Sequence, residues 1–130
     1  MPTALIVDDN EKNLKLARDV LREAGFRTLD ARSGSCGISL ALAHVPDVVL
    51  LDLRLPDLDG TDVVRRLRAD IRSARIPVVA MSATPLDPED DWFLAAGFDG
   101  YLAKPIDVGA LPEQVRRFCA PGAREGCWHT

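Results

Sequence analysis

Apolar and polar segments alternate along the chain, and the period of the apolar residues changes from one segment to the next. Five short segments predict β-strands at 4–7, 26–31, 47–52, 76–81 and 99–102, and the run at 47–52 is continuously apolar between carboxylates. Elsewhere apolar residues recur three and four positions apart, as at Leu14, Ala17 and Leu21, which predicts amphipathic helices. Strands and helices that alternate in this way are typical of a doubly wound α/β fold, a parallel sheet covered by helices on both faces.

Residues that begin or end helices stand between these segments. We expect the first helix to begin at Asn10 and to stop at Gly25, and Ser33 and Asp107 to cap the second and the last. A third helix carries Val63, Val64 and Leu67, and a fourth is expected over 87–96, ending at Gly97. The pattern predicts one domain over residues 1–120, followed by a short flexible tail at 121–130.

Composition and charge narrow the classes of function. The 130 residues have the size of one domain, and 20 acidic against 16 basic residues give a net charge of −4. An acidic chain without a basic block is a poor candidate for binding nucleic acid or an anionic membrane. No apolar run approaches the ~20 residues of a membrane span, and the N-terminus does not resemble a signal peptide, so we expect a cytoplasmic protein.

The three cysteines, Cys36, Cys119 and Cys127, are widely spaced and form no Cys-x-x-Cys pair or Cys/His cluster. This spacing argues against a zinc site. Cys36 and Cys119 stand among apolar residues and are predicted to pack as small hydrophobic side chains.

Chemically active side chains follow the predicted strands at one end. Asp8 and Asp9 follow the first strand and Asp52 ends the third, while Ser82 and Lys104 lie just beyond the fourth and the fifth. In a doubly wound sheet, ligands bind beyond the carboxyl ends of the strands. We therefore expect these side chains to converge at one edge.

Three carboxylates placed close together repel one another unless a cation joins them, and Mg²⁺ prefers oxygen ligands. A carboxylate can also attack phosphorus, forming an aspartyl phosphate, if a metal, a cation and a hydroxyl group hold the phosphoryl oxygens. Asp52, Asp9, Lys104 and Ser82 fit these roles. Each also has a plain structural interpretation: Asp8, Asp9 and Ser82 as helix caps, Asp52 as a turn residue and Lys104 as a solvated lysine.

Taken together, the motifs resemble the receiver domain of bacterial two-component response regulators, over about residues 3–119. The resemblance rests on Val7-Asp8-Asp9, on the segment 51–60, on Met81-Ser82-Ala83, on Lys104-Pro105 and on Tyr101. The opening Asn10-Glu11-Lys12-Asn13 is similar to stand-alone, single-domain regulators of the DivK, polar-differentiation type. The resemblance implies a flavodoxin-like (βα)5 fold with strand order 2-1-3-4-5.

The resemblance also implies a set of roles. Asp52 would accept a phosphoryl group, with Mg²⁺ bound, from a histidine kinase or a histidine phosphotransfer protein. Asp9, Asp52 and the backbone carbonyl of Arg54 would ligate the metal, and Asp8 would be linked to it through a water. Phosphoryl binding and switching would fall to Ser82, Ala83, Lys104 and Tyr101. The resemblance further implies that Arg54 and Thr84 control the lifetime of the phosphoryl group and that the Lys104-Pro105 peptide is cis.

The implied output is a change in the surface formed by the helix at 87–96, the strand at 99–102 and the helix after Asp107. Trp92, Leu94 and Tyr101 are expected to form part of this output face, an apolar patch that a downstream protein or a second copy of the chain covers. Trp92 alternatively fills a gap at the edge of the core. The chain is then a signalling switch rather than an enzyme, although it promotes its own phosphorylation and dephosphorylation.

Other functions remain to be weighed. A receiver without a dedicated output would serve as a phosphate sink or relay intermediate. A phosphatase of the haloacid-dehalogenase type needs an acid two residues after its nucleophile, where Asp8 is followed by Asn10. A flavodoxin-like cofactor binder needs a Ser/Thr/Gly-rich loop after the first strand, where this chain has two carboxylates. A degenerate receiver, which is never phosphorylated, would lack one of the required residues, whereas this chain has every one of them.

Overall fold

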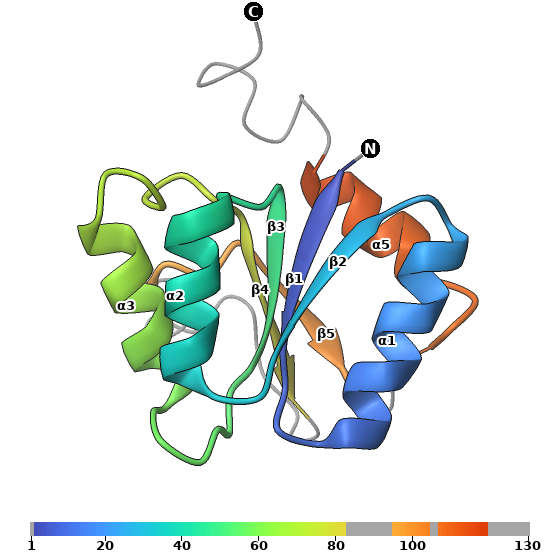
Figure 1. Cartoon of the computed structure of the whole chain (residues 1–130), viewed down its shortest axis with the longest axis horizontal. Helices are drawn as coiled ribbons and strands as arrows, with labels where there is room; N and C mark the ends of the chain where they lie inside the picture. Colours follow the sequence, from blue (N-terminus) through green and yellow to red (C-terminus); the bar gives the residue numbers. More distant parts are fainter. Residues whose placement is uncertain (1, 83–94, 105–106, 120–130) are drawn as a thin grey trace, which may run out of the picture.

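The structure, a computed structural model, describes residues 2–82, 95–104 and 107–119. Five parallel strands form a single sheet in the order β2-β1-β3-β4-β5, which confirms the predicted fold class and strand order (Figure 1). The strands are β1 (Thr3–Val7), β2 (Arg27–Ala31), β3 (Val48–Asp52), β4 (Val78–Ser82) and β5 (Gly100–Ala103).

Helices cover both faces of the sheet. The helices α1 (Glu11–Glu23) and α5 (Leu111–Cys119) lie on one face, and α2 (Gly34–His44) and α3 (Gly60–Ala69) lie on the other (Figure 1). Every residue of β3 is buried, and its side chains alternate between the two cores: Val49 and Leu51 pack on the α2–α3 side, Val48 and Leu50 on the α1–α5 side. This explains the continuous apolar run, because a central parallel strand has no face in water.

The helix boundaries follow local hydrogen bonding. The Asn10 side chain accepts from the N–H groups of Lys12 and Asn13 at the start of α1, and the Ser33 side chain accepts from the Cys36 N–H at the start of α2. Both predicted helix starts are confirmed. Gly25, just beyond α1, has a φ of 99°, a left-handed conformation that favours glycine.

Arg68 on α3 forms a junction with the segments that lead into β4 and β5. Its guanidinium donates to the carbonyls of Ala74 (3.1 Å), Ile76 (2.6 Å) and Gly97 (2.7 Å) and to the Asp99 carboxylate (2.7 Å). The same Asp99 oxygen accepts from the Val78 N–H at 2.9 Å. One side chain therefore ties the starts of the two strands to α3.

Two sequence predictions need comment. Cys36 is exposed and does not pack as a small hydrophobic residue, because α2 turns Gly34, Gly37 and Ala41 towards the sheet instead. Cys119 is half-buried, and burial raises the pKa of its thiol to about 12. Most of the helix predicted at 87–96, and the tail at 121–130 with Cys127, lie outside the described residues.

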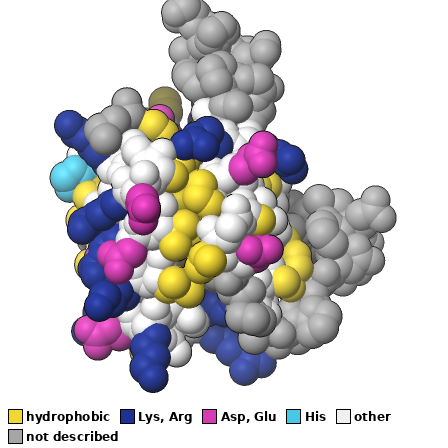
Figure 2. Space-filling view, turned by 90° about the vertical axis from the view of Figure 1, so that its right-hand side faces the viewer, with side chains coloured by type: hydrophobic (Ala, Val, Ile, Leu, Met, Phe, Trp, Pro, Cys, Tyr) yellow, Lys and Arg dark blue, Asp and Glu magenta, His cyan; other side chains and the backbone are white. Residues whose placement is uncertain are grey.

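The face formed by α1 and α5 carries a band of hydrophobic side chains among charged ones (Figure 2). Leu16 on α1 and Val108 ahead of α5 are exposed hydrophobic residues of these segments. None of the helices in the described ranges is both long and apolar enough to cross a membrane.

Candidate functional site

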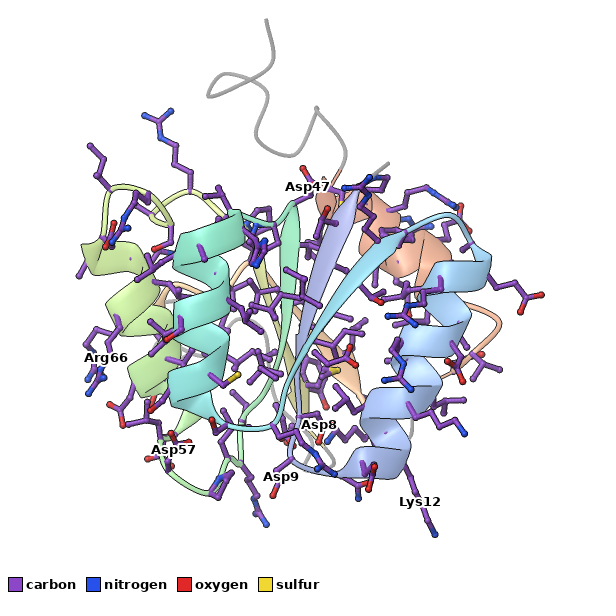
Figure 3. The ribbon with its side chains drawn as sticks, viewed as in Figure 1. Asp8, Asp9, Lys12, Asp47, Asp57 and Arg66 are labelled. Atoms are coloured by element: carbon purple, nitrogen blue, oxygen red, sulfur yellow. The ribbon has the colours of Figure 1, made fainter. Side chains whose placement is uncertain are left out.

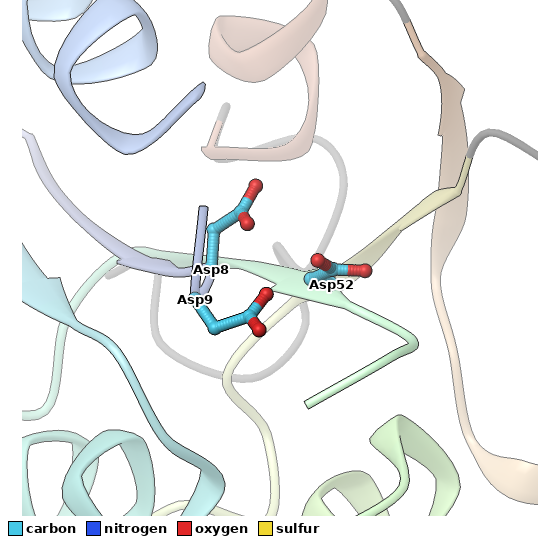
Figure 4. Close-up of side chains that lie close together, drawn as sticks. All are labelled: Asp8, Asp9 and Asp52. Carbon is cyan, nitrogen blue, oxygen red and sulfur yellow. The ribbon is translucent and has the colours of Figure 1, made fainter. Parts of the chain in front are cut away.

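The carboxyl ends of the strands place three aspartates side by side. The ladder of β1 continues one residue further, where the Asp8 N–H donates to the Ala31 carbonyl at 3.0 Å, and Asp52 is the last residue of β3. One carboxylate oxygen from each of Asp8, Asp9 and Asp52 lies within 4.8 Å of the others (Figure 4). The structure thus brings together the three acidic residues that the sequence placed at strand ends.

Lys104 joins two of these carboxylates. Its backbone N–H donates to the Ser82 carbonyl at 2.9 Å, which extends the pairing of β4 and β5 and directs the side chain over the sheet edge. Its Nζ lies 3.0 Å from Asp8 Oδ2 and 3.1 Å from Asp52 Oδ2. Asp8 and Asp52 are only 0% and 6% exposed, so this ammonium group is the cation that compensates two buried charges.

Backbone N–H groups hold the other oxygen of each buried carboxylate. Asp8 Oδ1 accepts from the Asn10 N–H at 2.9 Å, and Asp52 Oδ1 accepts from the Arg54 N–H at 3.0 Å. Both carboxylates are therefore oriented from two sides, by a backbone donor and by Lys104. Asp8 does not cap α1, since the Asn10 side chain does so.

Burial and charge act against each other in this cluster. Burial raises the pKa of the Asp8 carboxyl, although the Asn10 N–H and the Lys104 ammonium both oppose the rise. Burial by itself would lower the pKa of Lys104, but its hydrogen bonds to Asp8 and Asp52 outweigh that effect and the pKa is raised. Lys104 is thus a firmly charged cation next to a carboxylate that is costly to ionise without one.

Asp9 is exposed and opens onto a hollow of about 310 Å³. The hollow is lined by Asp9, Asn10, Asn13, Asp52, Arg54, Ser82 and Lys104. Carboxylate oxygens beside room for water are the surroundings that Mg²⁺ prefers, since this ion keeps several of its waters. The donor set therefore fits a hard divalent cation.

Two of the lining residues were not predicted as part of the site. Asn10 and Asn13 are three positions apart at the start of α1 and so lie on one side of its first turn. That spacing, directly after the two aspartates, was the signal in the sequence that could have indicated them.

Ser82 is the last residue of β4, and Tyr101 lies within the neighbouring strand β5. Ser82 is 8% exposed and borders the hollow. Tyr101 is half-buried, and its hydroxyl lies 3.5 Å from the Ser82 carbonyl, a long hydrogen bond. The structure therefore brings these two residues together next to Lys104. The other predicted site residues, Ala83, Thr84, Trp92, Leu94 and Pro105, lie outside the described residues.

The loop between β3 and α3 carries Arg54, whose side chain is exposed. The loop is closed at its base. There the Gly60 N–H donates to the Leu53 carbonyl at 3.1 Å, and the backbones of Arg54 and Asp59 form an antiparallel β-bridge. A Cβ at Gly60 would lie 2.9 Å from the Leu53 Cα, so the close approach of the chain requires glycine there.

Asp57, further along this loop, reaches the N-terminus of α2 (Figure 3). Its carboxylate accepts from the Gly34 N–H (2.8 Å), the Ser35 N–H (3.0 Å) and the Ser35 hydroxyl (2.8 Å). These donors lower the pKa of Asp57 to about 2. The sequence analysis had given Asp57 no role beyond its place in the segment 51–60.

Comparison with known proteins agrees with this arrangement. A family model described as the response regulator receiver domain matches residues 4–116. The polar-differentiation response regulator DivK of Brucella ovis is 34% identical over 116 residues, which cover 89% of this chain and 94% of the relative. The same protein of Brucella anthropi is also 34% identical, over the same shares of both chains.

Solved structures share the fold. The chemotaxis response regulator CheY4 of Vibrio cholerae superposes with a TM-score of 0.84 at 24% identity, covering 91% of this chain and 98% of that one. The receiver domain of sensor histidine kinase PA1611 from Pseudomonas aeruginosa has a TM-score of 0.82 at 32% identity, covering 91% and 97%. That structure has a magnesium ion coordinated in its active site cleft.

Proposed function

The chain belongs to the response regulator receiver family, whose members act in two-component signalling by phosphorylation, and on this premise we propose that Asp52 is its phosphoacceptor. The phosphoryl group comes from the phosphohistidine of a histidine kinase or a histidine phosphotransfer protein. The observation that carries the proposal is the Lys104 ammonium bridging Asp8 and Asp52, with Asp9 beside them. A buried, charge-compensated carboxylate at a sheet edge is well placed to meet an incoming phosphoryl group.

The metal that fits the site is Mg²⁺. Asp9, Asp52 and the backbone carbonyl of Arg54 would ligate it, and Asp8 would hold one of its waters. Bound there, the ion supplies positive charge that offsets the carboxylates and the phosphoryl oxygens. The PA1611 receiver domain, with its coordinated magnesium ion, supports this choice.

The chain's own residues account for the transfer. A carboxylate oxygen of Asp52 attacks phosphorus, an O–P bond forms, and the N–P bond to the donor histidine breaks. A carboxylate nucleophile has no proton to lose, so no general base is required. Lys104, already 3.1 Å from Asp52, pairs with the phosphoryl oxygens, and the Ser82 hydroxyl with the neighbouring Ala83 N–H donates to one of them.

Phosphorylation then shifts the balance between two conformers of the protein. Ser82 moves towards the phosphoryl group, and Tyr101, which lies against the Ser82 carbonyl, follows it inwards. This changes the output face of Trp92, Leu94 and Tyr101, which binds a downstream protein or a second copy of the chain. Arg54 and Thr84 set the lifetime of the phosphoryl group.

In this function the chain is a cytoplasmic switch that promotes its own phosphorylation and dephosphorylation. Residues 1–120 form the receiver domain. An alternative is that the chain passes or drains phosphoryl groups without a dedicated output, a role that uses the same site.

The test is labelling of the protein with a small phosphodonor such as acetyl phosphate, with and without Mg²⁺. We expect one phosphoryl group per chain, dependent on Mg²⁺, and none on Asp52→Asn. Asp59→Asn, in the same loop, is the matched control and should label as the wild type does. Undiminished labelling of Asp52→Asn would show that the acceptor lies elsewhere.

A further inference from the structure

The N-terminus of α2 is held by two different side chains. The N–H groups of Gly34 and Ser35 donate to Asp57, while that of Cys36 donates to the Ser33 hydroxyl. The first N–H groups of a helix have no partner within the helix and must find one elsewhere. Ser33 is the local cap of α2, whereas Asp57 comes from a loop 22 to 23 residues further along the chain.

The loop that carries Asp57 is fixed at two places. At its base, Gly60 and Leu53 approach closely, and the backbones of Arg54 and Asp59 form a β-bridge. Further along, Asp57 binds α2, and the neighbouring Leu58 packs closely enough on Gly34 that a Cβ there would lie 3.0 Å from the Leu58 side chain. Arg54 stands at the base of the loop, two residues after Asp52, and its N–H donates to Asp52.

We propose that Asp57 is a positioning residue for phosphorylation: by fastening the β3–α3 loop to the N-terminus of α2, it holds the Arg54 backbone against Asp52. This inference rests on the function proposed above. The Arg54 N–H orients the acceptor carboxylate, and the Arg54 carbonyl belongs to the same short stretch of loop. If the loop is released from α2, only the attachments at its base still hold it, and the Arg54 backbone is positioned less firmly against Asp52 and the metal site.

The simpler interpretation is that Asp57 only stabilises α2. The two interpretations differ in what Ser33→Ala should do. That change removes the other cap of the same helix and leaves the loop attached, so it should lower stability without disturbing the site. Asp59→Asn controls for charge, because Asp59 is exposed, lies in the same loop and makes no side-chain capping bond.

The experiment compares full-length wild type, Asp57→Asn, Asp57→Ala, Ser33→Ala and Asp59→Asn. The rate of labelling by acetyl phosphate is measured over a series of Mg²⁺ concentrations, and urea unfolding is measured on the same samples. We expect both Asp57 variants to need about tenfold more Mg²⁺ for half-maximal labelling, the lower end of the effect of residues that orient metal ligands. The asparagine side chain keeps one acceptor oxygen, so Asp57→Asn should raise the required Mg²⁺ concentration less than Asp57→Ala does.

Ser33→Ala and Asp59→Asn should keep the wild-type Mg²⁺ dependence, even though Ser33→Ala unfolds at lower urea. The proposal is overturned if the Asp57 variants keep the wild-type dependence, or if Ser33→Ala shifts it equally. If Asp57→Ala does not fold, the Mg²⁺ dependence of labelling of Asp57→Asn alone decides between the two interpretations. Absence of labelling in the wild type would instead contradict the proposed function itself.

Discussion

Replacing Lys104 by methionine should destabilise the metal-free protein, because it removes the cation between two buried carboxylates. Methionine keeps much of the aliphatic stem, so the change is mainly one of charge. Asp8 and Asp52 would then face each other with one oxygen of each within 4.8 Å, both still shielded from water. In the described part of the chain these carboxylates form their ion pairs with Lys104, so the change leaves both without an ion pair until a metal ion enters.

The magnitude follows from the geometry. At 3.0 and 3.1 Å, each Lys104 contact is a direct ion pair, and removing one partner of a buried pair costs about 3–5 kcal/mol. The Lys104 side chain is 13% exposed and borders a hollow that admits water, so the lower end applies, about 3 kcal/mol. With a urea m-value of about 1–3 kcal/mol/M, this shifts the unfolding midpoint by roughly 1–3 M.

The assay is urea unfolding at pH 7 in the presence of EDTA. Lys12→Met is the control, since Lys12 is an exposed lysine on the first turn of α1 and points away from the cluster (Figure 3). It should leave the midpoint nearly unchanged. Mg²⁺ should restore part of the loss in Lys104→Met, because the ion supplies the missing positive charge.

The dependence on pH gives a second check. The pKa of Lys104 is raised above its ordinary value of 10.5, so the stability it contributes is fully present below pH 10.5. That contribution is lost as the pH rises through the raised pKa, and the wild type and the variant should then converge. A Lys104→Met midpoint equal to that of the wild type at pH 7, or a loss as large in Lys12→Met, would refute the reasoning.

Three further predictions concern single side chains. Asp8→Asn should stabilise the metal-free protein at pH 7, because it removes a carboxyl group whose pKa is raised by burial, while Lys104 keeps its ion pair with Asp52. The favourable contribution of Asp8 is present at low pH and lost as the pH rises through its raised pKa, so urea unfolding with EDTA at pH 4 and 7 measures the difference. Asp57→Asn should remove one source of acid sensitivity. The stability that Asp57 contributes is fully present above its ordinary pKa of 3.8 and is lost as the pH falls through about 2, so an acid titration followed by circular dichroism detects the difference. Gly37→Ala should cost about 1–3 kcal/mol in thermal unfolding, because the added Cβ would lie 2.8 Å from the Val7 side chain.

The strands and the site at their ends could be predicted because their signals are local. The run at β3 is apolar without interruption, and only a strand buried on both faces accounts for such a run. Asp8, Asp52 and Lys104 then meet at one edge because parallel strands all end on the same side. No long-range information beyond the order of the strands was needed.

Other features depend on contacts between distant segments, which the sequence pattern does not encode. The bond from Asp57 to Gly34 joins residues 23 apart, and the spacing of neither segment indicates it. Cys36 stands in an apolar stretch, yet the helix turns it outwards because two glycines and an alanine occupy the buried side. Val45 ends α2 with a φ of 45°, where the usual signal would be glycine or asparagine.

The two ends of β5 are fastened in different ways. Among the described strands β5 lies at one side of the sheet and pairs with β4 alone. Its first residues are held by Arg68, which binds the Gly97 carbonyl and the Asp99 carboxylate that also binds β4. Its last residues are held by Lys104, through the N–H bond to Ser82 and the ion pairs with Asp8 and Asp52. The first attachment is independent of the aspartates, whereas the second must rearrange when a metal ion or a phosphoryl group takes the place of an ion pair, so binding at the site alters how firmly this side of the sheet is held.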